Sequence, residues 1–185
     1  TRQIPNAINL YKQNVKSVVL IGNEDAIGAG IIISDDEILT NFHVVKGAET
    51  VDLVLYNPNY TSLSSIDKGD IFTGDVIAVD SERDIALVKT NRSLKNKVKF
   101  GQDWRIDIAS DVFAIGHPSG LWGFTYGVIS ALPKPKEWTY DGDHFMKANC
   151  IQTQTPINPG NSGGPLYNHT GKLIGMNTST AEGEG

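Results

Sequence analysis

The sequence predicts an all-β protein built from short strands. Short runs rich in β-branched residues recur along the chain, and Gly or acidic turn residues such as Asp35 and Asp36 separate them. Only one segment has a helical pattern. Strands of this length and spacing are typical of barrels or of a sandwich.

The one predicted helix lies at the N-terminus. Ile4, Ile8, Tyr11 and Val15 fall at i, i+4, i+7 and i+11, and Pro5 suits a first helical turn. We expect this apolar stripe to pack on a barrel. The strands predicted after it are Ser17–Gly22, Ala29–Ser34, Glu37–Asn41, Val51–Tyr56, Asp75–Val79, Ile85–Lys89, Asp111–Ile115, Gly127–Leu132, Cys150–Thr153 and Lys172–Asn177.

Three polar segments are predicted as connections. Asn57–Asp70 is rich in turn residues and predicts a long exposed loop, and Asn91–Gln102 predicts the connection between two halves of the chain. Pro133–Lys136 reads Pro-Lys-Pro-Lys, which predicts a stiff, basic, solvated loop.

Composition argues against several classes of protein. The 16 basic and 21 acidic residues give a net charge of −5, whereas a nucleic-acid-binding protein needs a basic face. No apolar run approaches the roughly 18 residues that span a bilayer, so we do not expect a transmembrane protein. The single cysteine, Cys150, excludes an intrachain disulfide, and no Cys/His pattern indicates zinc. We therefore predict neither a metal nor a cofactor.

Three short segments carry residues that suit nucleophilic catalysis. His43 lies in the run TNFHVV at the end of a predicted strand, Asp84 opens the run DIALVK, and Ser162 lies in the glycine-rich run PGNSGGPL. A serine hydroxyl needs a base, a histidine can accept and return its proton near neutral pH, and a carboxylate can hold the imidazole in one tautomer. Glycines beside the serine let backbone N–H groups approach a developing oxyanion.

In this order the segments resemble those of trypsin/chymotrypsin-like serine proteases, and more narrowly the HtrA/DegP branch. The resemblance extends from about Val15 to Ser179 and includes Ile27–Val45, the run AIGHP that begins at Ala114, and Gly127–Leu132. The interval between His43 and Asp84 is longer than this branch predicts, which indicates an insertion within Asn57–Asp70.

The resemblance implies a single protease domain over residues 1–185, made of two antiparallel six-stranded β-barrels at about residues 15–95 and 108–185. His43 and Asp84 would come from the first barrel and Ser162 from the second. Gly160 and Ser162 would supply the N–H groups of the oxyanion hole. We expect a C-terminal end shortened relative to the family, and no PDZ domain in this chain.

The resemblance also gives expectations about specificity. Pro156 and Ile157 should form one wall of the primary specificity pocket, and Ser179 and Thr180 should border the other. No acid is expected at its base, so we predict a small or medium apolar side chain, such as Val, Ala or Leu, before the cut bond.

Sequence reasoning favours a serine endopeptidase of protein quality control that cuts unfolded or flexible polypeptides. The resemblance implies a location in the bacterial periplasm or cell envelope, which is usual for this family. A homotrimer formed through the N-terminal segment is a second interpretation of the apolar stripe. Two alternatives stay open: a pseudoprotease that serves as a binding scaffold, and a holdase-like chaperone with incidental cleavage.

Overall fold

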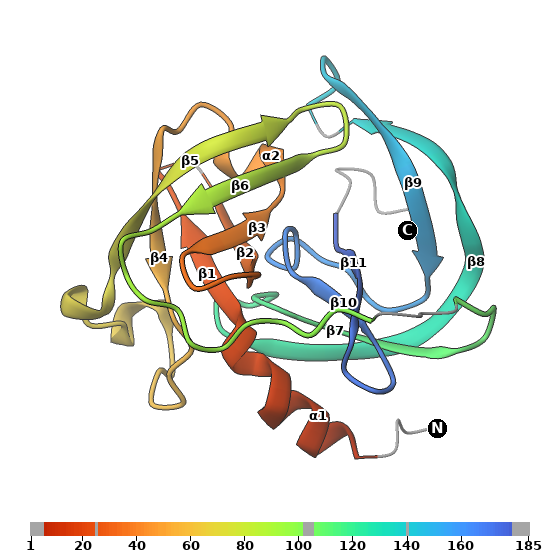
Figure 1. The fold of residues 1–185 in the computed structure, drawn as a ribbon, viewed down its shortest axis with the longest axis horizontal. Coiled ribbons are helices and arrows are strands. Elements are labelled where there is room, and N and C mark those ends of the chain that lie inside the picture. Colours follow the sequence, from red (N-terminus) through yellow and green to blue (C-terminus); the bar gives the residue numbers. More distant parts are fainter. Residues whose placement is uncertain (1–5, 25, 102–105, 140, 179–185) are drawn as a thin grey trace.

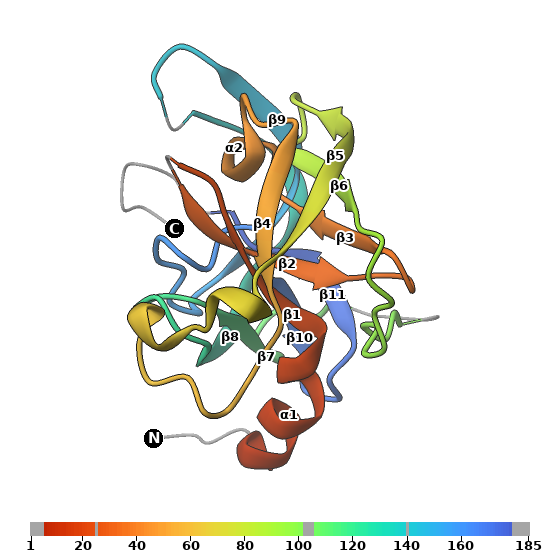
Figure 2. The same cartoon turned by 90° about the vertical axis from the view of Figure 1, so that its left-hand side faces the viewer.

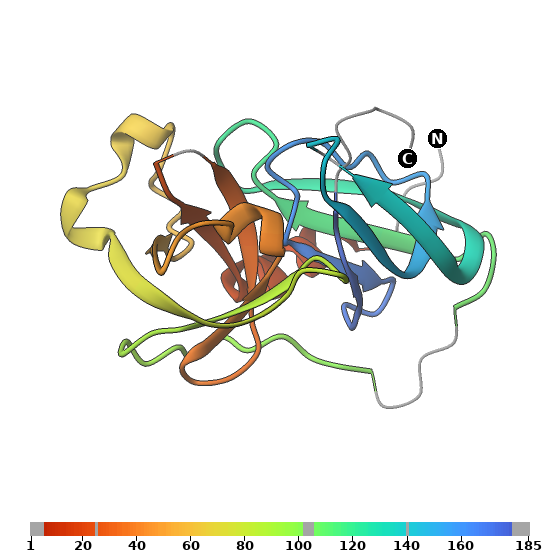
Figure 3. The same cartoon turned by 90° about the horizontal axis from the view of Figure 1, so that it is seen from above.

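A computed structural model describes residues 6–24, 26–101, 106–139 and 141–178 of the chain. Two β units lie side by side, with the short helix α2 (Phe42–Val45) near their boundary (Figure 3). The first unit is a closed barrel with strand order β1-β2-β3-β6-β5-β4. Its strands are β1 (Val18–Gly22), β2 (Ile27–Ile32), β3 (Glu37–Thr40), β4 (Thr50–Val54), β5 (Phe72–Asp80) and β6 (Ile85–Lys89).

The second unit is a strongly curved sheet that forms a nearly closed barrel (Figure 1). Within the described residues it has five strands rather than six, in the order β11-β10-β7-β8-β9. These are β7 (Asp111–Gly116), β8 (Gly123–Thr139), β9 (Phe145–Thr153), β10 (Pro165–Asn168) and β11 (Leu173–Met176). The predicted all-β, two-barrel class is therefore confirmed.

Apolar side chains that point inward hold the first barrel together. Ile38 and Leu53 are fully buried in its interior, where Val44 and Val45 of α2 also pack. Because α2 is only four residues long, it cannot be stable by itself. Its position is therefore fixed by the burial of these two valines, and the residue before them is His43.

Helix α1 (Ala7–Asn14) packs at one end of the molecule and continues into the 3-10 turn η1 (Val15–Ser17) (Figure 2). The predicted stripe is only partly correct. Val15 is buried, but Ile8 is 71% exposed, and Leu10 and Asn14 are the helical residues that are buried instead. The start of the predicted stripe, at Ile4 and Pro5, lies outside the described residues.

The predicted connections have different outcomes. Asn57–Asp70 contains no strand and carries two short 3-10 turns, η2 (Leu63–Ser65) and η3 (Lys68–Asp70). Residues 91–99 form an irregular link between the barrels.

The prediction of a loop at Pro133–Lys136 is wrong, because these residues lie inside β8. Among the described residues, this part of β8 pairs only with β9, since its pairing with β7 ends at Val128. The open edge of β8 leaves room for prolines, which lack an N–H to donate to a neighbouring strand.

Candidate active site

Asp84 is the most enclosed polar residue of the site. Its side chain is 0% exposed, and its backbone adopts a left-handed conformation with φ of 58°. Asp and Asn tolerate this conformation better than other non-glycine residues do. The Asn41 side-chain amide donates to the Asp84 carbonyl oxygen at 2.9 Å, which holds the turn before β6 against the end of β3.

The Asp84 carboxylate accepts hydrogen bonds from three donors. Oδ1 accepts from the backbone N–H of His43 at 2.9 Å, and Oδ2 lies 2.7 Å from Nδ1 of the same residue. The hydroxyl of Thr178 also donates to Oδ2, at 2.9 Å. Because an ionised carboxylate only accepts, the Nδ1 of His43 carries the hydrogen, and Nε2 is the unprotonated nitrogen of the neutral ring. The arrangement therefore fixes one tautomer of His43, whose side chain is 12% exposed.

Backbone contacts place the Ser162 turn beside the same structural elements. The carbonyl oxygen of Ser162 accepts from Ala29 N–H at 2.9 Å. A Cβ added at Gly28 would lie 2.8 Å from Val44 of α2 and 3.1 Å from the Ser162 carbonyl oxygen. Only glycine therefore fits where the Ser162 turn approaches the helix that carries His43.

The Ser162 turn is also joined to the segment that reaches Asp84. Gly163 N–H donates to the Asn177 carbonyl at 2.9 Å, and Asn177 N–H donates to the Gly164 carbonyl at 2.8 Å. Thr178, the next residue, donates to Asp84. The turn that carries Ser162 is therefore hydrogen-bonded to the segment whose next residue contacts Asp84 across the two barrels.

Gly160 lies at the other end of the glycine-rich turn. Its φ of 96° is in the region that favours glycine, and an added Cβ would lie 2.7 Å from the carbonyl carbon of His117. Its carbonyl oxygen accepts from His117 N–H at 2.9 Å. The AIGHP segment and the turn before Ser162 are therefore packed backbone to backbone.

A pocket of about 350 Å³ adjoins this contact. Its lining includes Gly160 and His117 together with Ile27 of the first barrel and Leu63 of the predicted loop. Leu63 also covers Gly120, where an added Cβ would lie 3.1 Å from the leucine side chain. The sequence did not indicate that this loop reaches the site.

The predicted specificity residues are only partly described. Ile157 is half-buried and packs against the apolar cluster of Val112, Ala114, Ile129 and Leu166. Pro156 is exposed, and its carbonyl oxygen accepts from the Asn161 amide at 3.3 Å. Ser179 and Thr180 lie outside the described residues.

Two contributors to the site were missed in the sequence. Thr178 and Asn41 both bond Asp84, but their residue types are common in strand ends and turns. Among residues 6–24, 26–101, 106–139 and 141–178, no group of three or more His, Cys, Asp or Glu side chains has a geometry that could hold a metal ion. No helix in the described part of the chain is long and apolar enough to cross a membrane.

Comparison with known proteins identifies the family. A family model for trypsin-like peptidase domains matches residues 28–176. The chain belongs to the trypsin-like peptidase family.

Its relatives include named serine proteases of the HtrA/DegP type. The chain is 39% identical over 158 residues to a putative serine protease HhoB of Synechocystis, covering 84% of this chain and 35% of that protein. It is 35% identical over 164 residues to a probable periplasmic serine endoprotease, DegP-like, of Chlamydia trachomatis, covering 87% of this chain and 30% of that protein. The chain therefore spans about a third of the length of these relatives.

A solved structure supports the same relationship. The crystal structure of Deg5 superposes with a TM-score of 0.72 at 29% identity, covering 94% of this chain and 84% of Deg5. The two-barrel fold of this chain is thus shared with Deg5.

The buried His117 gives a prediction about stability. Its side chain is 2% exposed, its ring lies 4.6 Å from the ring of Trp122, and neither ring nitrogen has a hydrogen-bond partner among the described residues. Burial lowers the pKa of His117 from 6.5 to about 3. Between these two values the unfolded chain binds a proton that the folded chain does not, so the free energy of unfolding falls as the pH falls.

We expect this one group to remove about 1.4 kcal/mol of stability per pH unit within that window. Urea unfolding of wild type and His117→Leu from pH 7 down to about pH 4 measures the effect. The difference in unfolding free energy between the two proteins should shift steadily in favour of the variant as the pH falls. A difference that is constant with pH would contradict a neutral, buried His117.

Proposed function

We propose that this chain is the catalytic domain of a serine endopeptidase that cuts flexible polypeptides. Ser162 is the nucleophile, His43 the general base and then the general acid, and Asp84 the residue that orients His43. The observation that carries the proposal is the 2.7 Å contact between His43 Nδ1 and the buried Asp84 carboxylate. The closeness of both Val44 of α2 and the Ser162 carbonyl oxygen to Gly28 supports it, because the Ser162 turn and the helix of His43 approach the same glycine.

The reaction proceeds in two halves. His43 Nε2 takes the hydroxyl proton as Ser162 Oγ attacks the scissile carbonyl carbon, and the N–H groups of Gly160 and Ser162 stabilise the oxyanion. His43 then gives that proton to the leaving amine, and an acyl-enzyme remains. Water, deprotonated by His43, attacks the acyl-enzyme and releases the second product, and Ser162 regains its proton.

The proposed substrates are extended chains, because a protease of this type binds its substrate alongside a strand edge. Unfolded and flexible proteins can adopt that conformation without the free-energy cost of unfolding. This suits a role in protein quality control. Relatives named as periplasmic endoproteases support a location in the bacterial envelope.

An active-site-directed fluorophosphonate probe tests the proposed nucleophile. We expect the probe to label the wild type at Ser162 and to leave Ser162→Ala unlabelled. Peptide hydrolysis by this variant should fall by about six orders of magnitude, as for other serine proteases. Ser119→Ala is the matched control, because it removes an exposed hydroxyl from the pocket beside Gly160 and should leave labelling unchanged.

Asp84→Asn tests the orienting role within the same assay. Asn also tolerates the left-handed backbone of residue 84, so the variant should fold. An amide at this position favours the wrong tautomer of His43, and kcat should fall by about 10⁴. If the folded wild type is never labelled by the probe, even with an activating peptide, the result would instead favour the scaffold alternative.

For specificity, we propose a small or medium apolar residue before the cut bond. Ile157 supports this, because it is an apolar, half-buried side chain that packs against the core of the second barrel. A peptide library that varies this position should give the highest kcat/KM for Val, Ala or Leu. A profile dominated by Lys or Arg would overturn the proposal.

For assembly, we propose a homotrimer formed through the N-terminal segment. Ile8 supports this, because a side chain that is 71% exposed on α1 can be buried by another copy. Sedimentation velocity should show a trimer for the wild type and a monomer for Ile8→Asp. Trimers of equal stability in both proteins would place the contact elsewhere.

A further inference from the structure

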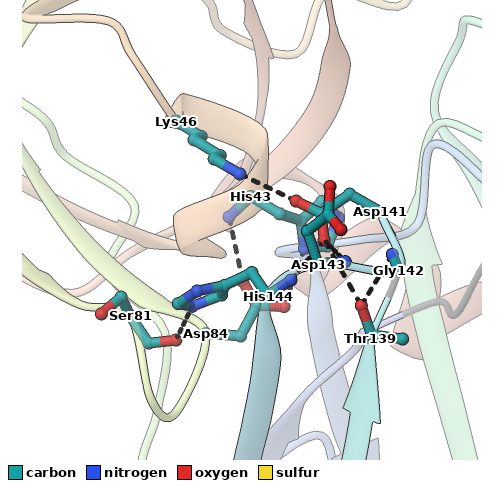
Figure 4. Close-up of polar contacts among 9 residues, drawn as sticks. All are labelled: His43, Lys46, Ser81, Asp84, Thr139, Asp141, Gly142, Asp143 and His144. Carbon is teal, nitrogen blue, oxygen red and sulfur yellow. Dashed lines mark hydrogen bonds and ion pairs between the residues drawn. The ribbon is translucent and has the colours of Figure 1, made fainter.

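The turn between β8 and β9 lies against both parts of the first barrel that carry the His43–Asp84 pair. We define the β8–β9 tip as residues 141–144, which connect toward β9 at Phe145. This tip belongs to the second barrel, whereas α2 and the turn before β6 belong to the first. Figure 4 shows the tip beside His43 and Asp84.

The first contact reaches the helix of His43. Lys46, which follows α2 directly, lies 2.8 Å from Oδ2 of Asp141. Oδ1 of the same carboxylate accepts from the backbone N–H groups of Asp143 at 3.1 Å and His144 at 2.8 Å. One oxygen of Asp141 thus orders the tip while the other binds Lys46. A carboxylate that is already ordered loses less side-chain entropy when it pairs.

The second contact reaches the turn of Asp84. Nε2 of His144 lies 3.0 Å from the carbonyl oxygen of Ser81, so Nε2 is the donor. Just beyond the tip, the N–H of Lys147 in β9 donates to the carbonyl of Glu82, the next residue of that turn. The His144 ring also lies 5.9 Å from the ring of Phe42, the first residue of α2. The tip therefore bridges the helix that carries His43 and the turn that carries Asp84.

We propose that the β8–β9 tip positions the His43–Asp84 pair relative to Ser162, with the Lys46–Asp141 ion pair as its adjustable contact. Lys46 and Asp141 are positioning residues. Ser162 and the tip lie on one barrel, whereas His43 and Asp84 lie on the other. A contact between the tip and the first barrel therefore sets the position of His43 relative to Ser162. Misplacing a base by about 1 Å can reduce catalysis by about 10²-fold. This inference rests on the proposed function, since it assigns the tip a role in that same site.

The ion pair is partly exposed, with side-chain exposures of 50% for Lys46 and 31% for Asp141, so its removal should have a moderate effect. We expect Lys46→Ala to lower kcat on a short peptide ester by about two- to five-fold with little change in KM. Asp141→Asn keeps the acceptor that orders the tip and should give the same loss. Lys46→Arg should retain activity. The double variant Lys46→Ala/Asp141→Asn should lose no more than either single variant.

The matched control is Lys97→Ala. It removes an ion pair between the link and the first barrel, Lys97–Asp35 at 3.0 Å, in which the lysine is 51% exposed. Its kcat should equal that of the wild type. High salt should lower the kcat of the wild type toward that of Lys46→Ala, but leave the kcat of Lys46→Ala unchanged, because salt screens the exposed pair. Equal kcat in all variants, or the same loss in Lys97→Ala, would overturn the proposal.

A second readout does not depend on catalysis. The Nδ1 proton of His43 should give a downfield proton resonance, identified by its loss in His43→Ala. We expect this resonance to shift or broaden in Lys46→Ala and to stay unchanged in Lys97→Ala, while the thermal midpoints of the two variants agree. If the wild type is not labelled by the probe, the proposed function fails and this measurement still tests the tip. An unchanged resonance in Lys46→Ala would then reject the positioning role.

Discussion

Burial of the Asp84 carboxylate is the constraint on which the rest of the site depends. A carboxylate with no solvent contact is destabilising unless donors replace the lost water. Here two donors come from His43 and one from Thr178, and all three lie within 3 Å. Each donor must stay in place for the charge to remain buried. The same requirement that stabilises the fold therefore fixes the tautomer and orientation of His43.

This constraint also links the two barrels. His43 and Asp84 come from the first barrel, but Thr178 follows β11 of the second, so the carboxylate obtains its full set of donors only when the barrels are docked. The bonds between Asn177 and residues 163 and 164 tie that donor to the Ser162 turn. The Ser162 turn and the third donor are thus held by the same backbone contacts, and both belong to the second barrel.

The sequence predicted what depends on local pattern. Alternating apolar runs gave Ile85–Lys89 with its bounds, and the types and order of His43, Asp84 and Ser162 gave the family. It did not predict what depends on partners far along the chain. Pro133 and Pro135 lie within β8 because β7 has no residue opposite them, and the exposure of Ile8 follows from the way α1 docks. Thr178 and Leu63 reach the site through tertiary packing, which no short motif encodes.

The contacts between the barrels near the site differ in their response to solvent. The Thr178–Asp84 bond is part-buried and ends on a carboxylate with no solvent exposure, so added salt should affect it little. The Lys46–Asp141 pair is exposed, and added salt weakens it. In the proposed positioning role, the Thr178–Asp84 bond is the contact that salt does not change, and the Lys46–Asp141 pair is the one that it does. If the proposed function and positioning role hold, ionic conditions would alter the placement of His43 and Asp84 while the core of each barrel stays intact.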